Sequence, residues 1–197
     1  MVEMEMKPLA IVQARMGSKR LPGKMLLLLG ERPLVWWAWD AAVTAFGEEN
    51  VICAIPASEE NDELAIALSQ YGARVWRWDG PESDVLGRFF FCAHTYRWHP
   101  ESVIVRVTAD DPFKDPAKLR RVAAGERLPE ATSGEAFTLR MLQVAHLSQT
   151  VEREHLTHIL YPCAAPEAPA GTWTIDTDID LAAARAIVAK IVNVWDE

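Results

Sequence analysis

The chain has 197 residues, of which 50% are hydrophobic, and its formal net charge at pH 7 is −8. This length can bury one sizeable core, and no apolar run approaches the roughly 20 residues of a membrane-spanning helix. A nucleic-acid backbone requires an extended basic face. The acidic balance therefore argues against nucleic acid as a partner, and the short apolar runs argue against a membrane.

The first residues and the cysteines lead to an expectation about the cellular compartment. The start, Met1 to Lys7, carries acids and lacks the apolar centre of a signal peptide. Three scattered cysteines, Cys53, Cys92 and Cys163, are odd in number and fit small buried hydrophobes better than disulfides or metal ligands. We therefore expect a cytoplasmic protein.

Strands and helices alternate along the predicted secondary structure. Apolar runs that favour strands occur at 9–12, 51–55, 74–78, 102–108 and 171–175, with a short strand near Glu135. Stretches that favour helices occur at 34–46, 61–71, 84–98, 116–125, 139–146, 151–160 and 178–194. Ser83 and Asp178 are the predicted N-caps of the third and the last of these helices. The alternation predicts βαβ units and a largely parallel sheet in one domain spanning 1–197.

The loop that follows the first predicted strand, 13–24, reads Q-A-R-M-G-S-K-R-L-P-G-K and contains no acid. Its cations are Arg15, Lys19, Arg20 and Lys24. Gly17 and Gly23 can adopt positive φ and let the backbone approach a ligand closely. Backbone N–H groups and cations that converge in this way favour a polyphosphate ligand. The loop matches neither the P-loop nor the dinucleotide-binding motif, and a solvated basic loop is the alternative interpretation.

Carboxylates follow two of the predicted strands. Asp110 comes after the fourth long strand and Asp176 after the last, and ligands of open α/β sheets bind beyond the carboxyl ends of the strands. Mg²⁺ usually takes one or two carboxylates together with phosphate oxygens and water. The sequence therefore predicts Asp110 and Asp176 as magnesium ligands, while Asp111 is a weaker candidate. The alternative role for Asp110 and Asp111 is an Asp-Pro turn or a cap of the next helix. A capping role for Asp178 leaves Asp176 free.

The motif Q-A-R-M-G-S-x-R-L-P-G-K resembles that of the cytidylyltransferases that activate acidic sugars, the acylneuraminate and 3-deoxy-manno-octulosonate type. The resemblance is greatest to the branch called spore coat polysaccharide biosynthesis protein F. Four further motifs follow in the family's order: D-V-L-G-R-F at 84–89, V-R-V-T-A-D at 105–110, E-R-E-H-L-T at 152–157, and W-T-I-D-T at 173–177 with D-L at 180–181. Together the motifs cover nearly the whole chain.

The resemblance implies a fold and a reaction. The fold would be a three-layer α/β sandwich with a mixed, mainly parallel sheet, of the nucleotide-diphosphosugar transferase type. The enzyme would be a CTP-dependent nucleotidyltransferase that transfers CMP to a sugar or sugar-acid acceptor and releases pyrophosphate. It would depend on Mg²⁺ and serve surface polysaccharide or glycan biosynthesis.

The resemblance also assigns roles to residues. The nucleotide would be bound by Gln13, Ala14, Arg15, Gly17, Ser18, Arg20, Lys24, Asp84 and Arg88. Substrate would be bound by Arg106, Glu135 and His155, and the metal by Asp110 and Asp176. Arg15, Lys24 and Asp110 would be the catalytic residues. Two alternatives stay open: His155 as a core histidine of an amphipathic helix, and Arg106 as a structural arginine paired with an acid.

The sequence departs from the family pattern in two places. Lys19 stands where the family usually has threonine or serine, which adds charge to the loop. The region 115–135 is shorter than in relatives, where it shapes the sugar site and often the dimer contact. The sequence therefore does not determine the oligomeric state. One expectation is a monomer with an open acceptor pocket. The alternative function is a catalytically reduced nucleotide-binding module that acts as a sensor or subunit.

Overall fold

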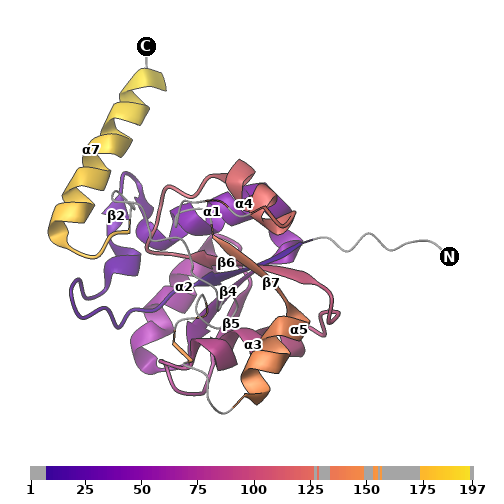
Figure 1. Ribbon diagram of the computed structural model, residues 1–197. Coiled ribbons are helices and arrows are strands. Elements are labelled where there is room, and N and C mark those ends of the chain that lie inside the picture. Colours follow the sequence, from indigo (N-terminus) through magenta and orange to yellow (C-terminus); the bar gives the residue numbers. More distant parts are fainter. Residues whose placement is uncertain are drawn as a thin grey trace.

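The computed structural model describes residues 8–126, 128, 134–148, 153, 154, 156 and 174–195. Five strands form one sheet in the order β5-β4-β1-β6-β7 (Figure 1). Their bounds are β1 Leu9–Gln13, β4 Val51–Pro56, β5 Val75–Trp78, β6 Val103–Thr108 and β7 Glu135–Thr138. The first four run parallel, and β7 runs antiparallel to β6. The predicted mixed, mainly parallel sheet is therefore confirmed.

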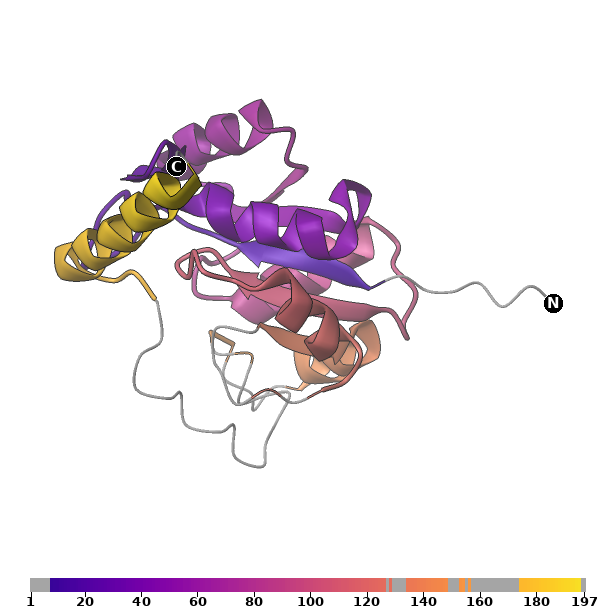
Figure 2. The ribbon, with the colours of Figure 1, turned by 90° about the horizontal axis from the view of Figure 1, so that it is seen from above.

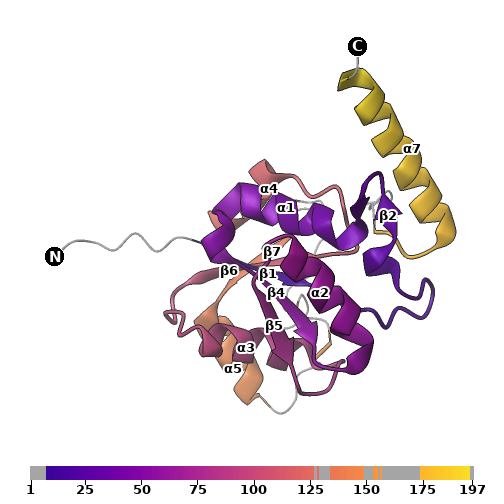
Figure 3. The same ribbon diagram turned by 180° about the vertical axis from the view of Figure 1, so that it is seen from behind.

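Helices cover both faces of this sheet. Their bounds are α1 Leu34–Phe46, α2 Asp62–Gln70, α3 Val85–Thr95, α4 Pro116–Ala123, α5 Leu139–Leu147 and α7 Asp178–Trp195. One hydrophobic cluster joins the sheet to α1, α2, α4 and α7, and the other joins it to α3 and α5. Seen from behind, α1 and α4 lie on one side of the strands and α3 and α5 on the other (Figure 3). These are the three predicted layers.

The central strand β1 shows why the core forms around it. Ala10 and Val12 are buried in the first cluster, and Ile11, between them, is buried in the second. A strand covered by helices on both faces has no polar side to present, which explains the continuous apolar run. The loop that follows β1 therefore starts from a fixed point in the middle of the molecule.

The last helix, α7, packs against a small hairpin that follows the loop after β1. Strands β2 (Leu28–Leu29) and β3 (Arg32–Pro33) pair antiparallel, and α7 lies alongside them in both views (Figures 1 and 2). Gly30 in the turn has φ 64°, and a Cβ there would lie 3.0 Å from a methyl carbon of Val188. The close approach of α7 thus depends on a glycine at this turn.

Two predicted caps are wrong by one residue. The N-cap of α3 is Asp84 and not Ser83, because the Asp84 carboxylate accepts a hydrogen bond of 2.7 Å from the Gly87 amide. Before α7 the cap is Thr177 and not Asp178. Asp180 accepts from the Thr177 amide at 2.8 Å, and its own amide donates to Thr177 Oγ1 at 3.3 Å. Polar neighbours compete for each cap: Asp84 accepts from the amide three positions later, and Thr177 forms a reciprocal pair with Asp180.

The last predicted strand and the helix predicted before it lie in the second half of the chain. The strand predicted at 171–175 is wrong for Thr174 and Ile175, which lie outside any strand. Ile175 nevertheless joins the end of β6, because its amide donates to the carbonyl of Asp110 at 2.8 Å. The helix predicted at 151–160 lies almost wholly outside the described residues, as does Cys163.

Burial supports the interpretation of two cysteines as small hydrophobes. Cys53 and Cys92 are free and buried, and burial raises the pKa of both thiols. Among the described residues, no helix combines the length and the apolarity needed to cross a membrane.

The cap of α3 provides a stability prediction. Besides the Gly87 amide, the Asp84 carboxylate binds Arg153 through Nε at 2.8 Å and Nη2 at 3.0 Å. We expect Asp84→Ala to lower the free energy of unfolding by about 1–2 kcal/mol, because a helix cap is lost. Urea unfolding measures the change, and Asp79→Ala, at an exposed acid in the preceding loop, serves as the control. Equal midpoints for the two variants would contradict the capping role.

Candidate active site

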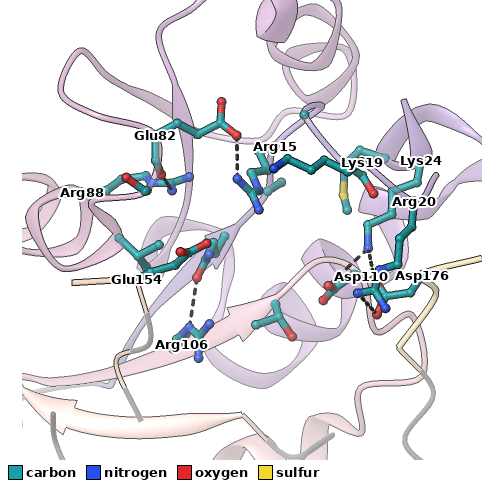
Figure 4. A pocket seen from close by; sticks show the side chains of 18 residues that line it. Arg15, Lys19, Arg20, Lys24, Glu82, Arg88, Arg106, Asp110, Glu154 and Asp176 are labelled. Atoms are coloured by element: carbon teal, nitrogen blue, oxygen red, sulfur yellow. Dashed lines mark hydrogen bonds and ion pairs between the residues drawn. The ribbon is translucent and has the colours of Figure 1, made fainter. Parts of the chain in front are cut away.

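A cavity of about 690 Å³ lies at the carboxyl ends of β1 and β6 (Figure 4). The loop after β1, the turn before α3 and the late residues Glu154 and Asp176 complete its walls. Most of the predicted site residues line it: Gln13, Ala14, Arg15, Gly17, Ser18, Arg20, Lys24, Arg88, Arg106, Asp110 and Asp176. The fold thus brings together segments from both ends of the sequence beyond the carboxyl ends of β1 and β6, where ligands of parallel sheets bind.

Lys24 is the most deeply held of the loop cations. Gly23, with φ 70°, turns the backbone into a short 3-10 helix, η1 (Lys24–Leu26), and the Lys24 side chain is 7% exposed. Its Nζ donates to the Ile175 carbonyl at 2.7 Å, to Asp176 Oδ1 at 2.9 Å and to Asp110 Oδ2 at 3.4 Å. An ammonium has three donors, so all three are satisfied by groups from two distant segments.

The two predicted metal ligands therefore meet at one point. Asp110 and Asp176 share the Lys24 ammonium, and the second oxygen of Asp176 lies 2.7 Å from Arg20 Nη2. Two carboxylates this close can hold one Mg²⁺ that takes its other ligands from phosphate and water. Within the described residues no group of three or more His, Cys, Asp or Glu could hold a metal. The donor set fits a metal that is shared with a phosphate ligand.

Asp111 has a different role from Asp110. Its side chain is 3% exposed and pairs with Lys114 Nζ at 3.0 Å, and its Oδ1 accepts from the Phe113 amide at 3.2 Å. This buried pair stabilises the turn between β6 and α4. The geometry therefore places Asp110, and not Asp111, in the cavity.

Arg15 is paired with an acid that the sequence reasoning missed. Its Nη1 lies 2.7 Å from Glu82 Oε1, and both residues line the cavity (Figure 4). A Cβ at Gly17 would lie 2.9 Å from the same carboxylate oxygen. Gly17 does not have a positive φ, so the expectation for it is corrected: this glycine provides space for Glu82. Glu82 precedes a recognisable motif but belongs to none, and only the fold brings it to the loop.

Arg88 is fully buried in the wall of the cavity, and two of its three nitrogen atoms are unsatisfied as hydrogen-bond donors in the described residues. Its Nη2 donates to the Glu82 carbonyl at 2.8 Å, whereas Nε and Nη1 have no hydrogen-bond partner in the part of the chain that the structure describes. Burial, with a smaller contribution from Arg15, lowers the pKa of Arg88 to about 10, so it is still charged at neutral pH. Leaving buried charged donors unsatisfied is costly. A ligand oxygen in the cavity would relieve this cost.

Arg106 is already paired. It lies opposite Glu135 in the register of β6 and β7, and the two side chains form an ion pair of 2.7 Å. Its Nε also donates to Gln13 Oε1 at 3.0 Å. The alternative of an arginine paired with an acid thus fits the structure: Arg106 lines the cavity, and the ion pair holds Glu135 beside it.

Three predicted residues do not line the cavity or cannot be placed. Asp84 is occupied by the cap of α3 and by Arg153, and Glu135 reaches the cavity only through Arg106. His155 lies outside the described residues. The cavity walls also contain Ser83, Thr108 and Glu154, each of which lies inside or beside a family motif. Their position inside or next to a motif is the sequence signal from which these three residues could have been predicted.

The family model of cytidylyltransferases matches residues 9–157. The chain belongs to the cytidylyltransferase family. It is 31% identical over 212 residues to spore coat polysaccharide biosynthesis protein SpsF of Bacillus subtilis, covering 92% of this chain and 86% of that protein. It is 30% identical over 113 residues to the 3-deoxy-manno-octulosonate cytidylyltransferase of Colwellia psychrerythraea, covering 57% of this chain and 39% of that protein.

A solved cytidylyltransferase from Leptospira borgpetersenii has the same fold. The TM-score is 0.79 and the sequence identity 24%, with 94% of this chain and 87% of that chain covered. The predicted fold type is therefore confirmed. Family membership likewise confirms the predicted resemblance and the enzyme class, a CTP-dependent nucleotidyltransferase.

Because two donors of Arg88 are unsatisfied within the described part of the chain, we predict that removing this arginine does not destabilise the fold. We expect Arg88→Met to leave the free energy of unfolding unchanged or to raise it by up to about 4 kcal/mol, because an incompletely paired buried charge is removed. Arg106→Met is the matched control. It should lower that free energy by about 1–3 kcal/mol, since Glu135 and Gln13 each lose a charged donor. Guanidinium unfolding compares the two, and a larger loss at Arg88 than at Arg106 would show that Arg88 is a structural residue.

Proposed function

We propose that the whole chain, 1–197, acts as one nucleotidyltransferase domain. It transfers CMP from CTP to a sugar or sugar-acid acceptor, with release of pyrophosphate, in surface polysaccharide or glycan biosynthesis. The observation that carries this proposal is the meeting of the acid-free cationic loop with Asp110 and Asp176 in one cavity. We expect the reaction in the cytoplasm, where thiols such as Cys53 and Cys92 stay reduced.

The cationic loop is the proposed triphosphate site. Arg15, Arg20 and Lys24 all line the cavity, and each is paired with a carboxylate of the same cavity. A triphosphate offers charge-assisted hydrogen bonds to the same donors. Binding therefore exchanges internal ion pairs for pairs with phosphate, and it leaves Glu82 and the two aspartates available for other contacts.

The proposed reaction is an in-line displacement at the α-phosphorus of CTP. The acceptor oxygen forms a new bond to that phosphorus, its proton is released, and the bond to the leaving pyrophosphate breaks. Arg15 and Lys24 stabilise the charge that accumulates on the pyrophosphate, and the cavity wall holds both reactants in place. Asp110 and Asp176 would hold Mg²⁺, which supplies further charge neutralisation when bound.

The acceptor would enter at the side of the cavity formed by Arg106 and Glu154. The Arg106–Glu135 pair can offer both a donor and an acceptor to sugar hydroxyls. This assignment of Arg106 and Glu135, like that of His155, remains a prediction. The oligomeric state also remains a prediction, and light scattering at micromolar concentration tests whether the chain is a monomer.

The triphosphate site predicts a loss of affinity. We expect Arg15→Met to weaken CTP binding by about tenfold to a hundredfold, because one charge-assisted contact of about 1.5–3 kcal/mol is lost. Isothermal titration at fixed salt measures the affinity, with Arg97→Met, at an exposed position outside the cavity, as the charge-matched control. Equal affinities of the two variants would exclude Arg15 from the triphosphate site.

The carboxylate pair predicts a loss of turnover. Asp110→Asn and Asp176→Asn should each abolish most pyrophosphate release, and the double variant should be little worse because residues that act as a unit are not additive. Asp111→Asn is the control: it should lower the melting temperature, since a buried partner of Lys114 is weakened, yet keep turnover. Activity loss in Asp111→Asn alone would mean that the wrong carboxylates are paired. CTP binding without pyrophosphate release across a panel of sugars would favour the reduced binding module.

A further inference from the structure

Lys24 stands at the point where the two proposed metal ligands converge. We propose that its ammonium keeps the Asp110–Asp176 pair closed to divalent cations in the nucleotide-free protein. The metal then enters only with a nucleotide, whose phosphates take over the ammonium. This inference rests on the proposed function and assigns it an order of binding. Lys24 thereby becomes a positioning residue for the metal as well as a contact for the triphosphate.

The first argument is the occupancy of the carboxylate oxygens. Lys24 Nζ pairs with Asp110 Oδ2 and with Asp176 Oδ1, and Arg20 pairs with Asp176 Oδ2. Three of the four oxygens therefore face a cation already. Two carboxylates and two cations also add up to no net charge. A free divalent cation would gain little attraction from such a set, and it would be repelled by two positive neighbours.

The second argument is burial. The side chain of Lys24 is 7% exposed, whereas those of Asp110 and Asp176 are 31% and 24% exposed. The Ile175 carbonyl, at 2.7 Å, provides the third acceptor. The two carboxylates are therefore more exposed to the cavity than the ammonium, which lies between them. A buried ammonium that loses its counter-ions pays a large desolvation cost, so the lysine leaves this position only for another strong acceptor.

A triphosphate is such an acceptor, and it changes the charge balance. Arg20 and Lys24 both line the same cavity as the aspartates, and a lysine has a flexible four-carbon stem. When phosphates attract both cations, the oxygens of Asp110 and Asp176 are released together. The aspartates and the phosphates then form a strongly anionic, all-oxygen set. Mg²⁺ is usually bound in this way, through one or two carboxylates and the phosphates of the substrate.

The test measures Mn²⁺ binding to the full chain without nucleotide, from the electron paramagnetic resonance signal of free Mn²⁺. Lys24→Met keeps the length of the side chain and removes its charge. We expect it to bind one Mn²⁺ at least about tenfold more tightly than the wild type, which corresponds to about 1.4 kcal/mol. Lys19→Met, at a loop cation that lines the cavity but pairs with neither aspartate in the described residues, should bind as weakly as the wild type. Adding Asp176→Asn to Lys24→Met should remove the gain.

A second measurement needs no substitution and decides the question if Lys24→Met does not fold. A CTP analogue with a methylene group between the α- and β-phosphorus is added to the wild type. The protein–analogue complex should bind Mn²⁺ more tightly than the protein alone or the analogue alone. Tight Mn²⁺ binding by the nucleotide-free wild type would overturn the proposal. So would a Lys24→Met variant that gains no affinity, or a gain that survives Asp176→Asn.

These outcomes are separate from the fate of the proposed function. If no sugar releases pyrophosphate but the Mn²⁺ results hold, the transfer reaction is wrong and the order of binding stands. If pyrophosphate is released and the wild type binds Mn²⁺ without nucleotide, the reaction stands and the role of Lys24 as a closing residue is wrong.

Discussion

The structure depends on one buried ammonium. Lys24 joins the loop after β1 to the end of β6 through Asp110, and to the residues before α7 through Ile175 and Asp176. A charge at this depth must be compensated, so these segments cannot separate without a large cost. The Thr177 cap starts α7 directly after this contact, and the helix is then carried onto the β2–β3 hairpin. The same interaction that organises the site thus fixes where α7 begins on the fold.

Much of the sheet could be predicted from the sequence because periodicity is a local signal. The apolar run of β1 and the bounds of α1, Leu34–Phe46 between Pro33 and Gly47, follow from residue types alone. The antiparallel direction of β7 could not be predicted, since nothing within Glu135–Thr138 says which strand it pairs with. The caps show the same limit on a smaller scale: Ser83 and Asp84 can both cap α3, and only the side-chain geometry chooses between them.

In the candidate site, too, some features could be predicted from the sequence and others could not. Asp176 follows no strand among the described residues, and the Ile175 amide joins its segment to the Asp110 carbonyl instead. Asp110 follows β6, beyond whose carboxyl end ligands of a parallel sheet bind, so its place in the cavity could be predicted from position. The partner of each cation could not. Glu82 reaches Arg15 across 67 positions, from a turn with no motif of its own, and this contact exists only because α3 packs where it does. Ion pairing at such separations is a property of the folded chain and has no trace in local composition.

The pairing pattern sets how the site gains affinity. At Arg15, Arg20 and Lys24 a nucleotide bound as proposed would replace carboxylates that are already paired, so each contact would be an exchange with a net gain smaller than the bond itself. At Arg88 two buried donors have no partner among the described residues, and a ligand oxygen there would gain the full difference between an unsatisfied and a satisfied charge. In the proposed site, affinity would therefore come disproportionately from the buried wall beside α3. The exchanged pairs would instead convert the arrival of a polyphosphate into a new charge distribution around Asp110 and Asp176, and that redistribution would prepare the cavity for a metal.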